Sequence, residues 1–307
     1  MTLHEIPLER GTLHGHFSRD LEPILTVESG DSIAFACLDA GWHTSPGATF
    51  EPRDEDRDAG HALIGPVEVR GARAGGTLEV SVDRVTVGSW GWCGAGDWST
   101  PLNDRLGLSE GPGVLLEWTL ADGRGRDERG HELDLHPFLG VLGMPPPEPG
   151  VHSTTPPRVW GGNIDCKELV EGTRLYLPIP VDGALFSAGD CHARQGDGEV
   201  SQLAIECPLE RAEITLTVHA DLPLATPIAW TENGWLTFGF DRDLDEAAAV
   251  AIDAMLELMG REHGLERAEA LALASLVVDL RVTQVVNEVQ GVHAVLPHDA
   301  IRFTRMA

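Results

Sequence analysis

Residues 189–201, with the sequence GDCHARQGDGEVS, bring together side chains that are well suited to chemistry. If a strand ends here, Asp190 and His192 point to the same face, because side chains alternate along a strand. A carboxylate beside an imidazole is typical of a metal site or an oriented general base, although the short Asp-x-His pattern also occurs in surface turns. Gln195 and Glu199 follow, with a further carboxylate between them and glycines that permit tight turns. This crowding of like charges indicates a site that binds a cation or uses a carboxylate as a base.

A second polar stretch, GGNIDCKEL at 161–169, carries an amide, a carboxylate and an ammonium at alternate positions. Asn163, Asp165 and Lys167 would face one side of a strand. Lys167 is the only lysine among 22 basic residues, and a planar guanidinium does not replace a compact ammonium at a site that needs one. The three residues are therefore candidate site residues. A surface ion pair between Asp165 and Lys167 is the simpler alternative.

Other candidates stand alone in the sequence. Asp39 directly follows the alternating segment SIAFACL, where a strand can deliver a residue to a site. His14 and His16 have the spacing of metal ligands, but exposed histidines have it too. Residues 89–98 hold three tryptophans among glycines, which either line a pocket or cap a core. Cys191, beside the histidine of the first stretch, leaves a thiol mechanism open.

Alternating hydrophobic residues predict strands over most of the chain. The segments TLEVSVDRVTV and AEITLTV alternate with period two, and Asn233–Gly234 between two tryptophans predicts a hairpin turn. Helices are predicted late, over about 244–278, where Asp243 begins a capping box and apolar residues follow the helical period. The predicted fold class is mainly β, an antiparallel β-sandwich or barrel-like architecture with a late pair of α-helices.

A proline-rich run at 143–157 separates two β-rich halves, 1–142 and 143–307, of which the second holds the helices. The run is either a linker or an ordered wall of a site. A length of 307 residues fits one large β-rich domain or two smaller ones. We expect the halves to form one intertwined domain.

The charge balance argues against two classes of partner. The chain has 22 basic and 49 acidic residues and a formal net charge of −27. Such a surface repels phosphate backbones and anionic lipid headgroups, so we expect neither nucleic-acid nor membrane binding. The first ten residues do not resemble a targeting signal. Five scattered cysteines without a CxxC pair are typical of free thiols in a reducing cytoplasm, and a cytoplasmic location is expected.

Several longer segments resemble the acetamidase/formamidase family. They are GGNIDCKEL, LYLPIPVDGALFSAGDCHARQGDGEV and LAIE, with HPFLGVLGMPPPEPGVHSTTPP before them, DLRVTQVVN after them, and HGHFSRDLEPILTV and IGPVEVRGARAGGTLEV in the first third. The pattern G-D-x-H-x-x-Q-G-D-G-E is highly specific, and the acetamidase branch is the nearer match. The chain departs from the family at Ile64, where the pattern has Thr, and at Ala74–Gly75–Gly76, where it has Pro-Gly-Asp. Both departures lie outside the polar motif.

The resemblance implies hydrolysis of small linear aliphatic amides, such as acetamide or formamide, to the carboxylate and ammonia. It also implies a mainly β homo-oligomer, a dimer or larger, and it is compatible with a bound divalent metal. The positions that match the family motif give Asn163 and Gln195 a place in the catalytic site.

A metal-activated water is the mechanism that we expect from these residues. Asp190, His192, Asp165 and Asp39 are the expected metal ligands. Zinc suits this mixture of nitrogen and oxygen donors best, and calcium or manganese is also compatible. Because the water must lose a proton, Glu199 is expected to act as the general base.

Lys167 is expected to stabilise the oxyanion or to fix a carboxylate. Two alternatives stay open. One is a metal-free amidase that uses Cys191 or a Lys167–carboxylate pair. The other is a β-sandwich that binds a ligand without turnover, although a binding pocket is usually more apolar than these stretches.

Overall fold

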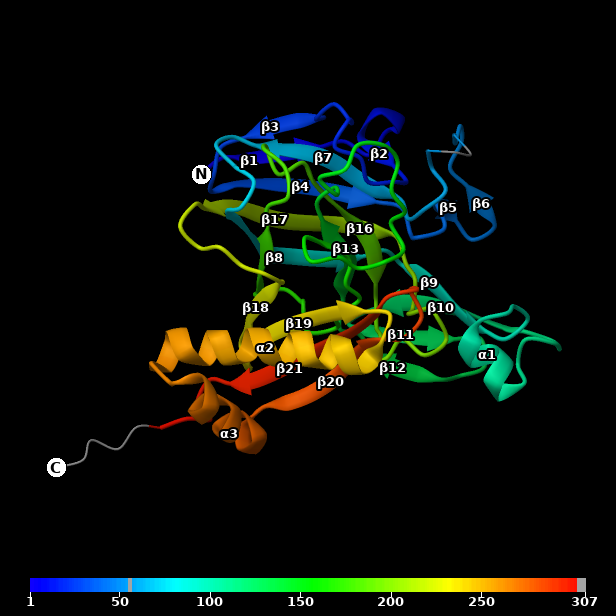
Figure 1. The fold of residues 1–307 in the computed structure, drawn as a ribbon. Coiled ribbons are helices and arrows are strands. Elements are labelled where there is room, and N and C mark those ends of the chain that lie inside the picture. The colour runs from blue at the N-terminus through cyan, green and yellow to red at the C-terminus, as the bar shows by residue number, and fades with distance from the viewer. Residues whose placement is uncertain (55–56, 303–307) are drawn as a thin grey trace.

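Antiparallel β-sheets make up most of the structure, a computed structural model that describes residues 1–54 and 57–302 (Figure 1). The strands are β1 (Leu3–Ile6), β2 (Leu13–His14), β3 (Leu25–Val27), β4 (Asp31–Cys37), β5 (His43–Ser45), β6 (Ala48–Thr49), β7 (Leu63–Val69), β8 (Thr77–Val87), β9 (Trp90–Ala95), β10 (Val114–Ala121), β11 (Arg124–Asp127), β12 (Glu132–Asp134), β13 (Phe138–Gly143), β14 (Gly161–Asn163), β15 (Arg174–Pro178), β16 (Phe186–His192), β17 (Leu209–His219), β18 (Ile228–Thr231), β19 (Gly234–Asp241), β20 (Asp279–Gln284) and β21 (Gln290–Pro297). The helices are α1 (Pro101–Leu106), α2 (Leu244–His263), α3 (Arg267–Val277) and the short 3-10 helix η1 (Arg10–Thr12).

The largest sheet has nine strands in the order β1-β4-β17-β8-β15-β18-β19-β21-β20. Strands from the two halves of the chain alternate in it, since β17 pairs with both β4 and β8. Opposite residues such as Leu216 and Val80 are both fully buried, and their side chains join the main hydrophobic core. The register shifts where Glu213 and Ile214 meet β8, close to Asp83. A β-bulge of this kind lets a long strand twist without losing its buried face.

A six-stranded sheet carries the first polar stretch, in the order β14-β13-β16-β7-β2, with β3 paired to β7. Its central strand β16 is buried along its whole length. On one side it pairs with β13, and on the other with β7. A strand buried on both faces normally carries apolar residues throughout. The polar end of β16 therefore needs partners inside the protein.

The two late helices pack against the C-terminal part of the nine-stranded sheet (Figure 1). Asp243 begins α2 by accepting a hydrogen bond from the backbone N–H of Asp245. The helix approaches β19 closely, because a Cβ atom at Gly239 would lie 1.9 Å from the carbonyl oxygen of Ala247. Thr237 on the same strand donates a hydrogen bond of 2.7 Å to the carbonyl oxygen of Ala251. Small residues on both partners thus allow this helix to lie against the sheet.

The mainly β fold class with a late pair of helices is confirmed. Asn233–Gly234 joins β18 to β19, with Trp230 opposite Trp235 as the hairpin pattern predicts. The short helix α1 was not expected, and Thr100 caps it by accepting from the N–H of Asn103.

None of the sheets formed by residues 1–54 and 57–302 closes into a barrel. None of the helices in these ranges is long and apolar enough to cross a membrane.

The proline-rich run at 143–157 packs against the rest of the protein. Thr154 is fully buried, and its hydroxyl contacts the N–H of His61 at 3.0 Å and the His61 ring at 2.8 Å. His152 pairs with Phe17 through two backbone hydrogen bonds of 2.9 Å. These contacts favour an ordered wall over a linker.

The buried ring of His14, at the edge of the six-stranded sheet, has a fixed tautomer. Nδ1 lies 2.7 Å from the carbonyl oxygen of His16, so it must donate there. Nε2 then accepts from the hydroxyl of Ser187 at 3.0 Å. Burial lowers the pKa of His14 to about 4. The folded protein thus holds this ring neutral where the unfolded chain would protonate it.

This histidine should make the protein less stable in acid. Between pH 6.5 and 4 the unfolded chain binds a proton at His14 that the folded protein does not, so the free energy of unfolding falls as the pH is lowered. The difference in pKa corresponds to about 3 kcal/mol. Urea unfolding should show that the unfolding free energy of the wild type falls by about 3 kcal/mol more between pH 7 and pH 4 than that of the His14→Gln variant. An equal loss in both proteins would contradict this.

Candidate active site

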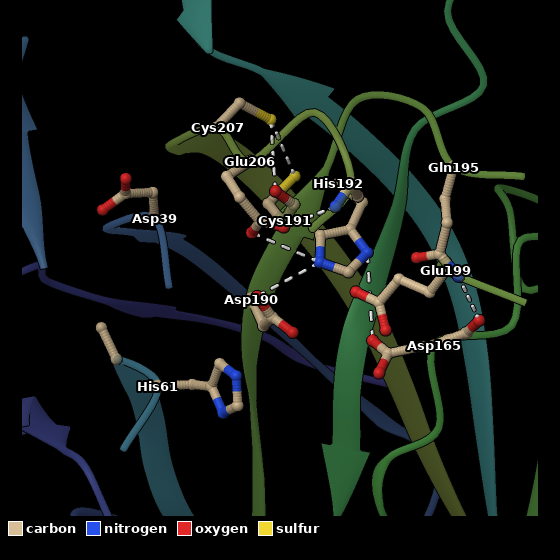
Figure 2. A network of polar contacts seen from close by, with 12 residues as sticks. Asp39, His61, Asp165, Asp190, Cys191, His192, Gln195, Glu199, Glu206 and Cys207 are labelled. Atoms are coloured by element: carbon tan, nitrogen blue, oxygen red, sulfur yellow. Dashed lines mark hydrogen bonds and ion pairs between the residues drawn. The ribbon is translucent and has the colours of Figure 1, made fainter. Parts of the chain in front are cut away.

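Buried ionisable groups meet around the ring of His192 at the end of β16 (Figure 2). The carboxylates are Asp190 on the same strand, Asp165 after β14, and Glu199 and Glu206 from the segment between β16 and β17. All five residues are at most 6% exposed. Four carboxyl groups and one imidazole in such a place are costly to bury unless they share protons or bind a cation.

The two ring nitrogens of His192 face different carboxylates. Nε2 lies 3.3 Å from Oδ1 of Asp190 and 3.4 Å from Oε2 of Glu206. Nδ1 lies 4.0 Å from Oδ1 of Asp165. The ring of Phe138 packs edge-on against the imidazole, with centroids 5.1 Å apart. The structure therefore divides the cluster into a side with Asp190 and Glu206 and a side with Asp165.

Several of these residues have an unusual backbone conformation. Asp165, Asp190 and Glu199 have φ angles of 53°, 57° and 46°. Such left-handed conformations cost free energy in residues other than glycine and persist only where the surroundings impose them. At these positions the backbone turns the carboxylates toward one another, which favours a functional role for the cluster.

Gly140, on the neighbouring strand β13, makes room for the carboxylates. A Cβ atom at this position would lie 2.5 Å from Oδ2 of Asp190, 2.7 Å from Oδ1 of Asp165 and 2.9 Å from Cε1 of His192. Real Cβ atoms do not come this close to other heavy atoms. The missing side chain of Gly140 is thus a condition for the cluster to form.

Several buried polar atoms of the site lack a hydrogen-bond partner among the described residues. They are Asn163 Oδ1, Asp165 Oδ1, Asp190 Oδ1, His192 Nδ1, Gln195 Oε1 and Glu206 Oε2. Buried polar atoms are nearly always paired in folded proteins, because each unpaired group costs free energy. Their concentration in one place indicates that the site is built to receive another group.

The donor atoms suit a metal ion. Two sets of three, Asp190–His192–Glu206 and Asp165–His192–Glu199, each offer ligand atoms within 4.8 Å of one another. Ligands of a tetrahedral zinc site lie about 3.4 Å apart, given bonds of about 2.0–2.2 Å. The contacts of His192 Nε2 at 3.3 and 3.4 Å agree with that spacing. These buried groups can therefore hold a metal ion.

The protons of the cluster are unevenly distributed. Burial, together with the charges of Glu206 and Asp190, raises the pKa of Glu199 to about 8. Burial and the charge of Glu199 also raise the pKa of Asp165 well above its usual value. Asp190 and His192 behave in the opposite way. Burial opposes their charges, but the imidazolium of His192 lowers the pKa of Asp190 to about 2, and the carboxylates of Glu206 and Asp190 raise the pKa of His192.

Two side-chain amides hold Asp165 and Glu199 in place, one at their carboxylates and one at the backbone of Asp165. Nδ2 of Asn287 lies 2.6 Å from Oδ2 of Asp165 and 3.4 Å from Oε2 of Glu199. Nε2 of Gln195 donates to the carbonyl oxygen of Asp165 at 2.7 Å. Sequence reasoning did not single out Asn287 or Glu206. Their signal was present, because they end the segments DLRVTQVVN and LAIE that resemble the family.

Lys167 lies apart from this cluster. Its Nζ is 3.1 Å from Oδ1 of Asp197 and its side chain is 30% exposed. The strand β14 ends at Asn163, and Asp165 has a left-handed backbone. For that reason the shared strand face predicted for Asn163, Asp165 and Lys167 does not form. Asn163 is buried, and its carbonyl oxygen Oδ1 is one of the unpaired atoms above.

Asp39 has other partners. Its Oδ2 accepts from Nε1 of Trp92 at 2.7 Å and contacts Nδ1 of His43 at 2.8 Å, and its Oδ1 accepts from the N–H of His43 at 2.7 Å. Figure 2 shows Asp39 and His61 on the Asp190 side of the cluster. The structure thus places Asp39 near the site with both oxygens occupied by neighbours.

The remaining candidates from the sequence lie in the core, along a pocket or against the backbone of another segment. Cys191 is fully buried in the main core, 3.8 Å from the sulfur of Cys207. Within residues 89–98, Trp90 and Trp92 line a pocket of about 1200 Å³ together with Trp118 from β10. His16 contacts the carbonyl oxygen of Arg57 at 2.7 Å.

Comparison with known proteins supports the resemblance seen in the sequence. Residues 149–223 match the model of the acetamidase/formamidase family. This segment includes Asp165, Asp190, Glu199 and Glu206. The resemblance to this family is therefore confirmed.

Single proteins with related names also resemble this chain in sequence or in fold. A formamidase of Methylophilus methylotrophus is 26% identical over 260 residues, which span 66% of this chain and 63% of that protein. The crystal structure of an acetamidase from Bacillus halodurans superposes with a TM-score of 0.83 at 29% identity, covering 95% of this chain and 97% of that one. A predicted acetamidase/formamidase from Thermoanaerobacter tengcongensis gives a TM-score of 0.84 at 27% identity, covering 98% and 100%.

The close approach at Gly140 leads to a stability prediction. The Gly140→Ala variant should lose about 1–3 kcal/mol of unfolding free energy, because the new methyl group displaces two buried carboxylates. Gly196 is a matched control, since a Cβ atom there meets nothing within 4 Å and its backbone is ordinary. Urea unfolding should place Gly196→Ala within about 0.5 kcal/mol of the wild type. Equal stability of the two variants would contradict the tight packing at Gly140.

Proposed function

The chain is related to the acetamidase/formamidase family by sequence and by fold, and on this basis we propose that it hydrolyses small linear aliphatic amides. The reaction converts the amide and water to a carboxylate and ammonia. The observation that carries the proposal is the buried cluster around His192, in which a high-pKa carboxyl lies beside donor atoms without partners. Acetamide and formamide are the substrates that we propose.

We further propose that a divalent metal, zinc by preference, is held by Asp190, His192 and Glu206. The atoms Asp190 Oδ1 and Glu206 Oε2 both lack a hydrogen-bond partner among the described residues and lie on the same side of the imidazole. A mixture of nitrogen and oxygen donors suits zinc, while the excess of carboxylates is also compatible with manganese or calcium. When bound, such an ion acidifies water and polarises a carbonyl group.

Asp165 and Glu199 are proposed to move the protons. Their raised pKa values mean that the pair keeps a proton near neutral pH, and a coupled pair of this kind can accept one proton and return another. With a pKa of about 8, Glu199 is ionised in only a minority of molecules at neutral pH, and in that form it takes the proton from the attacking water and delivers it to the departing nitrogen. Asn287 keeps the two carboxylates in position, and Gln195 fixes the backbone of Asp165, through the hydrogen bonds described above. Asn163, with its free amide oxygen, is suited to accept a hydrogen bond from the substrate's NH₂ group.

The metal-free alternatives have less support. Cys191 is buried in the apolar core and its strand neighbours, not its sulfur, face the cluster. Lys167 is bound to Asp197 and is partly exposed, so we propose that it holds this carboxylate rather than an oxyanion. Ammonia release from an added amide would separate this function from that of a ligand-binding β-sandwich. A homo-oligomeric state and a cytoplasmic location stay predictions from the resemblance and the cysteine content.

The proton role of Glu199 can be tested by one substitution. Glu199→Gln keeps the shape and removes the carboxylate, so kcat for ammonia release from acetamide should fall by about 100-fold or more. The exposed Glu210→Gln variant is the control and should keep the wild-type rate. Wild-type turnover in Glu199→Gln would remove this residue from the mechanism.

The metal proposal predicts that activity depends on a bound ion. Elemental analysis of the purified, unsupplemented protein should find at least one equivalent of a divalent metal per chain. Ammonia release should be lost after chelation and restored by zinc. Metal-free protein with full activity would overturn the metal role and would leave the chemistry to the carboxylates.

A further inference from the structure

A second cluster of ligand-type side chains lies between the loop that follows β14 and the C-terminal hairpin β20–β21. It consists of Cys166, Glu168 and His293, which we call the Cys166 cluster. His293 lies on β21, opposite Arg281 of β20. Asp165 precedes Cys166 directly, so one short loop supplies a residue to each cluster. The Cys166 cluster belongs to no step of the amidase mechanism.

The spacing of the three donor atoms suits a metal ion. Sγ of Cys166 lies 3.2 Å from Oε2 of Glu168, and Nε2 of His293 lies 3.5 Å from the same oxygen. All three atoms are within 4.8 Å of one another. Bond lengths of about 2.0–2.3 Å in a tetrahedral zinc site separate its ligands by about 3.4–3.7 Å. The two distances to Oε2 of Glu168 are close to this spacing.

His293 supplies the independent sign of a missing ligand. The residue is fully buried, and its Nε2 has no hydrogen-bond partner among the described residues. Its Nδ1 is held by the hydroxyl of Thr283 at 2.8 Å, which fixes the ring so that Nε2 points at Glu168. Metal-binding histidines are usually oriented in this way through their second nitrogen.

Charged side chains surround the Cys166 cluster. The Arg281 guanidinium contacts the other oxygen of Glu168 at 2.5 Å and bridges to Asp197 at 2.6 Å. Lys167 pairs with Asp197 as well. The thiolate and Glu168 would face the divalent cation, and Glu168 would be shared with Arg281, which Asp197 also holds. Glu168 is 18% exposed at its side chain, which gives an ion a route from solvent.

We propose that Cys166, Glu168 and His293 form a second metal site, for a borderline-soft divalent cation of the zinc type. A sulfur, an imidazole and a carboxylate select such ions over magnesium or calcium. On binding, the Cys166 thiol loses its proton to solvent and the sulfur forms a bond to the metal, with no change in oxidation state. The bound ion ties the loop that carries Asp165 to the C-terminal hairpin. The proposal does not rest on the amidase function.

Cadmium titration tests this site separately from the cluster around His192. The full-length protein is freed of metals with a chelator, dialysed and titrated with Cd²⁺, and thiolate-to-cadmium charge-transfer absorption is recorded in the near ultraviolet. The ligands Asp190, His192 and Glu206 include no sulfur, so metal bound there adds nothing to this band. We expect the band to reach a plateau by two equivalents of added Cd²⁺ per chain, because the sulfur-free site also takes up the ion.

Three variants make the test specific. Cys166→Ser should abolish the band, and Glu168→Gln should weaken Cd²⁺ binding at least about tenfold. Cys93→Ser is the control, because Cys93 is a half-buried free thiol outside both clusters, and its band should match the wild type. Absence of the band in the wild type, or an undiminished band in Cys166→Ser, would overturn the proposal. If Cys166→Ser fails to fold, unchanged affinity in Glu168→Gln would overturn it instead.

Discussion

The cost of burying charge governs the centre of this protein. Four carboxyl groups and a histidine are almost fully removed from solvent around one ring. In such surroundings each ionised group needs an opposite charge, a shared proton or a cation. The structure satisfies this need in a different way for each of two pairs of residues. Asp190 and His192 stabilise each other as an ion pair, while Asp165 and Glu199 are pushed toward their protonated forms.

The sheet architecture makes this arrangement possible. The strand β16 lies between β13 and β7, and at its buried end His192 pairs with Phe138 of β13 and with Glu206 after the pairing with β7 has stopped at Gly189. Gly140 on β13 leaves the volume that the carboxylates occupy. Left-handed backbone at Asp165, Asp190 and Glu199 then directs their side chains inward. Rigid strands and strained connections together fix the groups more firmly than flexible loops could.

The C-terminal hairpin links the two polar clusters. Asn287, in the turn between β20 and β21, contacts Asp165 and Glu199. His293 on β21 reaches the other side of the same loop, beside Glu168. The helices α2 and α3 therefore serve the site indirectly, since they support the sheet to which this hairpin belongs. Residues far apart in sequence thus depend on one another for their positions.

The sequence by itself determined the fold class, and it singled out two residues that meet at the centre of the candidate site. Period-two alternation identifies strands because it is a local property, and the helical period with a cap at Asp243 identifies α2 in the same way. Asp190 and His192 could be paired from their spacing, because residues two apart on a regular strand share a face, and they do meet in the structure although Asp190 has a left-handed backbone. Only the tertiary structure decided the rest. Glu206, Asn287 and Gly140 join the site through contacts across strands and loops that local patterns do not encode. Lys167 and Asp39 have other partners for the same reason. The left-handed backbone at Asp165 redirects the chain before Lys167, and Trp92 donates a hydrogen bond to Asp39. Both effects depend on neighbours that only folding supplies.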